Sequence, residues 1–147
     1  MKFTTEITVN VPRARFIELF DNPDNMKHWQ PGLVSFEPVS GTPGQPGAKS
    51  RLRYAQGSRE VEMIETITVR NLPDEFSGTY EGKGFLSVVK NYFSAPTPNT
   101  TRWVADNEFQ MSGFMKLMAW LMPGVFKKES QKLMDQFKAF AEKTSTP

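Results

Sequence analysis

Residues 11–32 have the sequence VPRARFIELFDNPDNMKHWQPG, which predicts two short helices in succession. The apolar residues within 16–20 have helical spacing, and Pro12 suits the first turn of a helix. The Asp-Asn-Pro-Asp segment at 21–24 can end the first helix and cap a second one that runs to about Trp29. This stretch decides the fold because the sequence on both sides of it has the periodicity of strands.

Apolar and polar residues alternate from residue 2 to residue 11, which is the pattern of a half-buried strand. After the helical stretch, turn-rich segments separate about six further alternating runs. These predicted strands cover residues 33–39, 49–54, 60–70, 76–80, 85–93 and 102–109. Because short turns connect most of them, we expect an antiparallel meander.

The period becomes helical again from about Ser112. The predicted apolar stripe comprises Met115, Met118, Met122, Phe126, Ser130, Leu133, Phe137 and Ala141. Pro123-Gly124 is expected to kink or break this helix near its first third, and the tail after Lys143 is expected to be coil.

These elements predict a single α+β domain over residues 1–147. Each strand has one apolar face, and only the long C-terminal helix is large enough to cover it. We therefore expect a curved antiparallel sheet of about six to seven strands wrapped around that helix, with two short helices after the first strand. Such a sheet can leave a cavity where the helix does not fill its concave face.

The run from Val11-Pro12 through Asp21-Asn22-Pro23-Asp24 to Trp29 resembles the opening of the SRPBCC (START-like, helix-grip) superfamily. Thr100 to Trp103, followed by Asn107-Glu108-Phe109, resembles the polyketide cyclase/dehydrase-type branch. The resemblance covers nearly the whole chain. It implies the helix-grip fold and a cavity for apolar ligands between sheet and helix, and it implies no shared catalytic set.

Composition excludes several kinds of site. The absence of cysteine excludes disulfides, thiol catalysis and cysteine-bound metals, and a single histidine excludes His-His metal motifs. Eighteen basic against sixteen acidic residues give a charge of +2, too small a surplus to indicate nucleic-acid binding. We expect a cytoplasmic monomer or homodimer that holds no metal or cofactor and does not insert stably into a membrane.

Two residues are candidates for acid–base chemistry. Glu65 shares a strand face with Val61, Met63, Ile67 and Val69, and a carboxyl group on an apolar inner face would have a raised pKa. The alternative is that Glu65 pairs with an arginine or lies at an open sheet end. His28, beside Trp29, could be a general base, or simply a residue at a helix end.

Further residues are expected to line the cavity and contact a ligand. Tyrosine and asparagine side chains would orient polar groups, and methionine and other apolar side chains would adapt to varied apolar ligands. The predicted ligand-binding set is Tyr54, Met63, Tyr80, Asn91, Trp103, Asn107, Phe114, Met118, Leu121 and Met122. Each asparagine could instead satisfy a backbone group, and the apolar side chains could simply fill the core.

Two basic segments favour ordinary solvated surfaces. Arg51, Arg53 and Arg59 are followed by Glu60 and Glu62, which favours an exposed strand face over a nucleic-acid site. Lys127-Lys128 beside an apolar helix could touch a membrane, but a core helix with a solvated basic side is the preferred interpretation.

Three functions remain open at this level. The preferred hypothesis is binding, transport or sensing of a small hydrophobic molecule, such as a lipid or an aromatic or polyketide-like metabolite. The alternative is a cyclase/dehydratase-type enzyme that uses an inward carboxylate in the same cavity. A third is a partner-binding module that uses the exposed side of the last helix.

Overall fold

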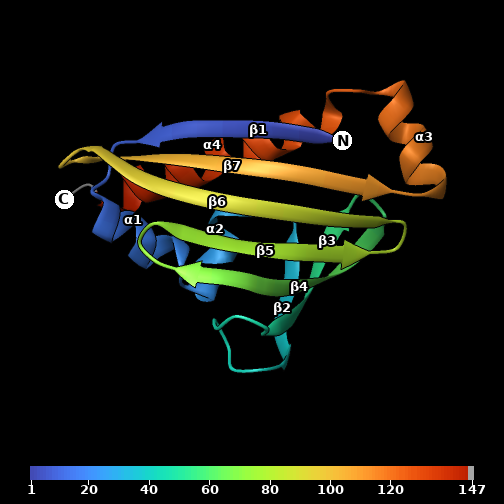
Figure 1. Ribbon diagram of the computed structural model, residues 1–147, viewed down its shortest axis with the longest axis horizontal. Helices are drawn as coiled ribbons and strands as arrows, with labels where there is room; N and C mark the ends of the chain where they lie inside the picture. The colour runs from blue at the N-terminus through green and yellow to red at the C-terminus, as the bar shows by residue number, and fades with distance from the viewer. Residues whose placement is uncertain (146–147) are drawn as a thin grey trace.

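The computed structural model describes residues 1–145, which form one curved sheet of seven antiparallel strands backed by helices (Figure 1). The strands are β1 (Lys2–Val9), β2 (Leu33–Ser40), β3 (Lys49–Gln56), β4 (Arg59–Asn71), β5 (Glu75–Gly82), β6 (Phe85–Thr97) and β7 (Thr100–Met111). Their order in the sheet is β1-β7-β6-β5-β4-β3-β2. The predicted meander is confirmed, since β2 to β7 are neighbours in chain order and β1 pairs with β7.

Two short helices follow β1, as predicted: α1 (Arg13–Phe20) and α2 (Met26–Trp29), with the 3-10 turn η1 (Pro23–Asn25) between them. The Asn22 side chain accepts a hydrogen bond of 3.0 Å from the backbone N–H of Asp24, which caps this turn. The Asp-Asn-Pro-Asp segment therefore ends α1 as predicted, but its side-chain cap serves η1, and α2 begins after Asn25 with no side-chain cap.

The C-terminal helical stretch is divided into α3 (Gly113–Leu121) and α4 (Val125–Ser145), so the predicted break at Pro123-Gly124 is confirmed. The α4 helix runs to Ser145, where Arg15 Nε donates to the Ser145 hydroxyl over 3.3 Å. The prediction of coil after Lys143 is therefore wrong for residues 144–145, and residues 146–147 lie outside the described part.

The core lies at the end of the sheet where α1, α2 and the last turns of α4 meet (Figure 1). Phe137 and Ala141 of α4 are buried there, as the helical stripe beyond the break predicts, and so is Met134, which lies outside the predicted stripe beside the half-buried Leu133. The Phe137 ring lies 4.7 Å from the Phe16 ring and 5.6 Å from the Trp103 ring, centroid to centroid. These tilted and edge-on aromatic contacts pack α4 against α1 and β7.

A β-bulge between Ile67 and Val69 changes which side chains of β4 point inward. The sequence pattern places Val69 on the Glu65 face, but the bulge pairs Val69 with Ser77 and leaves it 36% exposed. Arg70 points inward instead and donates to both carboxylate oxygens of Asp21, at 2.8 and 2.7 Å. The bulge thereby ties the end of β4 to α1.

Among residues 1–145, no helix combines the length and the apolar character needed to cross a bilayer.

Candidate functional site

The strand register places Glu65 in the middle of a row of inward residues that crosses the sheet. Ser50 of β3 pairs with Glu65 of β4, Glu65 pairs with Tyr80 of β5, and Tyr80 pairs with Ser87 of β6. Cross-strand partners have side chains on the same face. Glu65 therefore lies on the concave face, as the period of β4 predicts.

Three polar side chains of the strands lie together on this face: Tyr54, Glu65 and Tyr80. Gln30, the residue that follows α2, joins them. The Tyr80 hydroxyl donates a hydrogen bond to the Glu65 carboxylate. The Tyr54 hydroxyl donates a hydrogen bond of 2.6 Å to Gln30 Oε1 at the end of α2. Tyr54 also lies close enough to Glu65 for the two groups to interact electrostatically. We call Gln30, Tyr54, Glu65 and Tyr80 the inner-face cluster.

Electrostatics distinguish Glu65 from the other carboxylates. Burial raises the pKa of Glu65, and the hydrogen bond from Tyr80 lowers it by less. Burial, with the nearby Glu65 charge, also raises the pKa of Tyr54 and that of Tyr80. Within the described chain Glu65 forms no ion pair, so the pairing with an arginine considered above is wrong.

The two ends of the inner face differ in how completely side chains fill them. Around the core, Val9, Phe93 and Trp103 are almost fully buried. Toward the β5–β6 turn, inward side chains of three neighbouring strands keep part of their surface accessible. These half-buried residues are Met63, Glu65, Tyr80, Phe85 and Val89. Because these side chains point inward and still expose surface, this end of the concave face is covered less completely than the core.

The α3 helix lies beside this open end. Ser112, which precedes α3, donates its backbone N–H to Gly84 O in the β5–β6 turn over 2.9 Å. A Cβ on Gly84 would lie 3.5 Å from Met115 Cγ, so the first turn of α3 packs on that turn. Met115 and Met118 are both half-buried on this side of α3. Of the four ligand-binding residues predicted for the segment 114–122, only Met118 lies on the protein-facing side.

Phe114, Leu121 and Met122 face solvent rather than the inner face, with 69%, 59% and 50% of their surfaces exposed. Their predicted ligand contacts are corrected for a physical reason. The break at Pro123-Gly124 ends the continuous stripe, and α3 takes an orientation of its own.

Asn91, Trp103 and Asn107 lie on the inner face as predicted, but their polar groups are already engaged. Trp103 Nε1 donates to Asn91 Oδ1 over 2.8 Å, with both residues buried in the core. Asn107 Nδ2 donates to the backbone oxygen of Ala105 over 3.1 Å. The alternative considered for the asparagines, satisfying a backbone group, fits Asn107, whereas Asn91 is engaged by the Trp103 side chain.

His28 does not join the cluster. Its side chain is exposed, and its ring stacks on Phe140 of α4 at 5.5 Å between centroids. It is a helix-end residue on the outer side of α2. The carboxyl group of Glu65 is therefore the acid–base candidate that the structure retains.

Gln30 is the member of the cluster that sequence reasoning missed. It follows the last residue of α2 and is 8% exposed. Its position between Trp29 and Pro31 suggests only a helix end. No local sequence pattern identifies it, because its contact with Tyr54 joins two elements that are distant in the chain.

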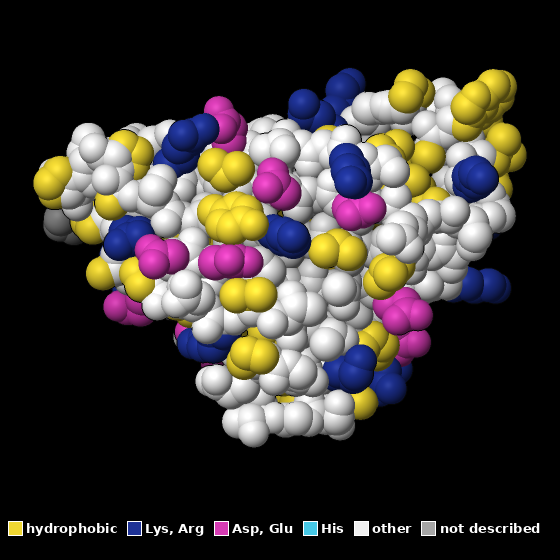
Figure 2. All heavy atoms as spheres, viewed as in Figure 1, with side chains coloured by type: hydrophobic (Ala, Val, Ile, Leu, Met, Phe, Trp, Pro, Cys, Tyr) yellow, Lys and Arg dark blue, Asp and Glu magenta, His cyan; other side chains and the backbone are white. Residues whose placement is uncertain are grey.

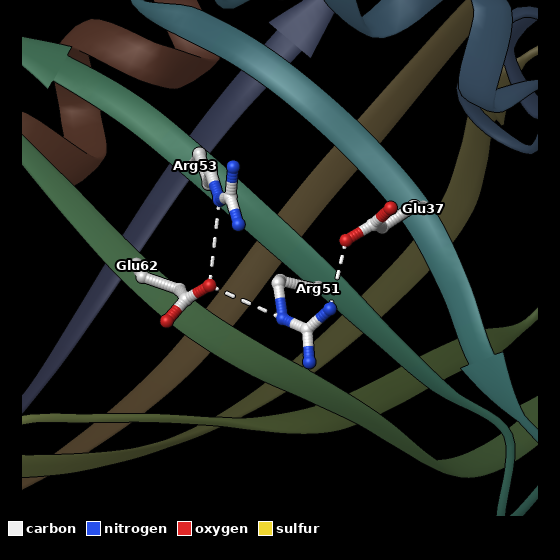
Figure 3. Close-up of polar contacts among 4 residues, drawn as sticks. All are labelled: Glu37, Arg51, Arg53 and Glu62. Carbon is white, nitrogen blue, oxygen red and sulfur yellow. Dashed lines mark hydrogen bonds and ion pairs between the residues drawn. The ribbon is translucent and has the colours of Figure 1, made fainter.

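The arginines of β3 lie on the opposite, convex face (Figure 3). Arg51 pairs with Glu37 at 2.8 Å and with Glu62 at 3.1 Å, and Arg53 pairs with Glu62 at 3.4 Å. All four side chains are at least one-third exposed. The predicted solvated strand face is confirmed for Arg51 and Arg53, and such pairs contribute little to stability.

Two clefts lie away from the cluster. One of about 400 Å³ separates η1 and α2 from β2, and one of about 420 Å³ crosses β1, β7 and β6. Charged side chains such as Lys27, Lys90 and Asp106 line them. No group of three or more metal-ligating side chains occurs among residues 1–145. The inner-face cluster is therefore the strongest candidate site, because it places a half-buried carboxyl group of raised pKa on a partly accessible apolar face.

Replacing Glu65 with glutamine is expected to raise the melting temperature near pH 7 by a few degrees. The folded state raises the pKa of Glu65 above its unfolded value, so wild-type stability falls as pH rises through the interval between the two pKa values. Glutamine removes this cost, and the difference should vanish below about pH 4, where the unfolded carboxyl group is protonated too. Thermal melts at both pH values test this. Glu62→Gln on the convex face is the control, and a Glu65→Gln variant less stable than wild type near pH 7 would contradict the assignment.

Comparison with known proteins gives a family and a fold. The family described as "Polyketide cyclase / dehydrase and lipid transport" matches residues 1–142. No curated protein matches the chain.

Solved structures similar to this chain include a START superfamily protein from Mycobacterium smegmatis, with a TM-score of 0.79 and 11% identity over 98% of this chain and 99% of that one. The Zhui aromatase/cyclase from Streptomyces sp. R1128 has a TM-score of 0.79 and 10% identity over 99% and 96%. Norcoclaurine synthase from Thalictrum flavum, solved with dopamine and hydroxybenzaldehyde, has a TM-score of 0.72 and 13% identity over 100% and 89%. At these identities the likeness establishes the helix-grip fold.

Proposed function

The chain belongs to the polyketide cyclase / dehydrase and lipid transport family, and on that basis we propose that it binds a small, largely apolar molecule against the inner face of its sheet. The observation that carries the proposal is Glu65, a partly accessible carboxyl group on an apolar surface that forms no ion pair with any residue of 1–145. A carboxyl group without a basic partner in such surroundings is uncommon in a purely structural core.

The hydrogen bonds that the cluster already makes limit the class of ligand it can bind. The hydroxyl hydrogens of Tyr54 and Tyr80 are already donated, to Gln30 and to Glu65. A carboxylate has about four acceptor sites, so Glu65 keeps acceptor capacity beyond the bond from Tyr80. The ligand that fits is therefore an apolar molecule carrying a hydroxyl group or another donor, such as a hydroxylated lipid or a phenolic, polyketide-like metabolite.

Binding need not be accompanied by chemistry. Burying roughly 300 Å² of apolar ligand surface contributes about 7 kcal/mol gross, of which association entropy removes several. Micromolar affinity then follows without a charge pair. We place a carrier or sensor first, because Glu65 is the one acid–base candidate that remains at the site.

An enzyme of the cyclase or dehydratase type is the second candidate, and one observation favours it. Burial raises the pKa of Glu65, which is the direction that suits a carboxyl group acting as an acid and a base. Solved neighbours include an aromatase/cyclase and norcoclaurine synthase. For an enzyme, Glu65→Gln would retain binding and lose roughly 10²–10⁴-fold in turnover.

The test begins with native mass spectrometry of the purified protein, compared with its denatured mass. A co-purified small molecule would identify the ligand class directly. In parallel, 2-naphthol and naphthalene are titrated as matched probes with and without a hydroxyl group. We expect 2-naphthol to bind roughly tenfold or more tightly, as a hydrogen bond to a charged group predicts.

Glu65→Leu should abolish this preference, because it removes the acceptor and keeps an apolar surface. Glu62→Leu on the convex face is the matched control and should keep the preference. Equal affinity of wild type for the two probes, or no binding of either, would overturn the proposed site.

A further inference from the structure

The most unusual surface of the protein is formed by α3 and the residue that follows it, which together expose five large apolar side chains within nine consecutive residues. Phe114 is 69% exposed and Trp120 77%, and Leu117, Leu121 and Met122 each expose at least half of their surface. Figure 2 shows hydrophobic side chains gathered at the upper right of this view, where Figure 1 places α3. Single exposed apolar residues are ordinary, but a contiguous group marks an interaction surface.

The α3 helix is apolar on both sides. Met115, Met118 and Ala119 lie on its less exposed side, and Phe114 and Trp120 lie outward. A helix that is apolar all round is typical of a helix surrounded by apolar material. At nine residues, α3 is about 13 Å long, less than half the thickness of a bilayer core, so it can lie in a membrane interface but not cross it.

Positive charge is concentrated beside this apolar surface. Residues 112–132 contain the lysines at 116, 127, 128 and 132 and a single acid, Glu129, which gives this segment +3 although the whole chain has only +2. All four lysines are exposed, and none forms an ion pair with another residue of the described chain. Their charges are therefore available to an anionic partner.

We propose that α3 docks reversibly in the interfacial layer of bilayers that contain anionic lipid, with Phe114, Leu117 and Trp120 at the acyl boundary and Lys116, Lys127 and Lys128 over the headgroups. Tryptophan favours this layer, and basic residues there bind anionic headgroups. A second copy of the chain fits less well, because it would bring one +3 segment against another. Docking does not depend on what the inner face binds.

The protein contains its own reporter for this test. Trp29 and Trp103 are 5% and 4% exposed, whereas Trp120 is 77% exposed, so Trp120 is the tryptophan whose surroundings docking would change. Adding vesicles of phosphatidylcholine with about 30% phosphatidylserine should shift its emission to the blue, and brominated lipid should quench it. Co-flotation with the same vesicles measures partitioning, which should fall at about 0.5 M salt and on pure phosphatidylcholine.

Variants separate the apolar and the charged contributions. The double variant Lys127→Glu, Lys128→Glu should reduce partitioning by roughly tenfold or more. Leu117→Ser should also weaken it, and Val39→Ser, at an exposed apolar position of β2, is the control that should not. Absence of flotation at low salt, or flotation unaffected by Leu117→Ser, would overturn the proposal. So would a wild-type dimer that Leu117→Ser converts to monomer in sedimentation velocity, since α3 would then join two copies.

Discussion

A Phe137→Ala variant is expected to lose about 3–5 kcal/mol of unfolding free energy. Phe137 is fully buried, and its ring packs against the rings of Phe16, Trp29 and Trp103 at 4.7, 5.0 and 5.6 Å between centroids. These partners come from α1, α2 and β7, so truncation leaves a cavity that no single element can collapse to fill. Urea denaturation gives the free energy, and the melting temperature should fall on the order of 10 °C.

Phe114→Ala is the matched control, because it removes the same ring from a position that is 69% exposed. Its expected effect on stability is within about 0.5 kcal/mol. Phe137 lies on the predicted helical stripe, and Phe114 was predicted as a ligand contact but lies on the surface of α3. Equal losses for the two variants would contradict the placement of α3 on the surface.

The fold was predictable from sequence because its signals are local and repeated. The alternation of the strands and the Asp21–Asp24 capping segment each act within a few residues, and the sheet with its two inserted helices follows from them. Val69 was placed on the wrong face because the alternation of residues in β4 gives no sign of the β-bulge between Ile67 and Val69. One extra residue reverses every later side chain.

Residues of the candidate site were predictable where the alternation within one strand determines which face they lie on. They were not predictable where the site depends on how two elements pack together. Glu65, Tyr54 and Tyr80 lie inward because the period of their own strands puts them there. Gln30 could not be placed, since its contact with Tyr54 depends on how α2 sits against β3. Phe114, Leu121 and Met122 were misplaced because the direction of α3 after the β7 turn is a tertiary property.

Asn91 is the second position where a substitution should have a large effect, and the effect concerns stability rather than ligand affinity. Its Oδ1 accepts the Trp103 indole N–H over 2.8 Å, and the two residues are 7% and 4% exposed. Asn91→Ala leaves that N–H buried without an acceptor, which costs about 1–3 kcal/mol. Urea denaturation measures the loss.

Two further variants show whether the acceptor, rather than the volume, is responsible. Asn91→Asp keeps an oxygen for the indole and should retain more stability than Asn91→Leu, which fills the space and offers none. Asn107→Ala is the control on β7, because the Asn107 amide donates only to a backbone oxygen at 3.1 Å. Its removal leaves no indole N–H without an acceptor.

Titration with 2-naphthol and naphthalene then shows whether Asn91 belongs to the core or to the ligand site. Asn91→Ala should bind 2-naphthol as wild type does, because its polar group belongs to the pair with Trp103 and not to the row of Glu65 and Tyr80. A variant that keeps its stability but loses the preference for 2-naphthol would instead make Asn91 a ligand contact. The inner-face cluster would then extend from β4 and β5 across the sheet to β6 and reach the edge of the aromatic core.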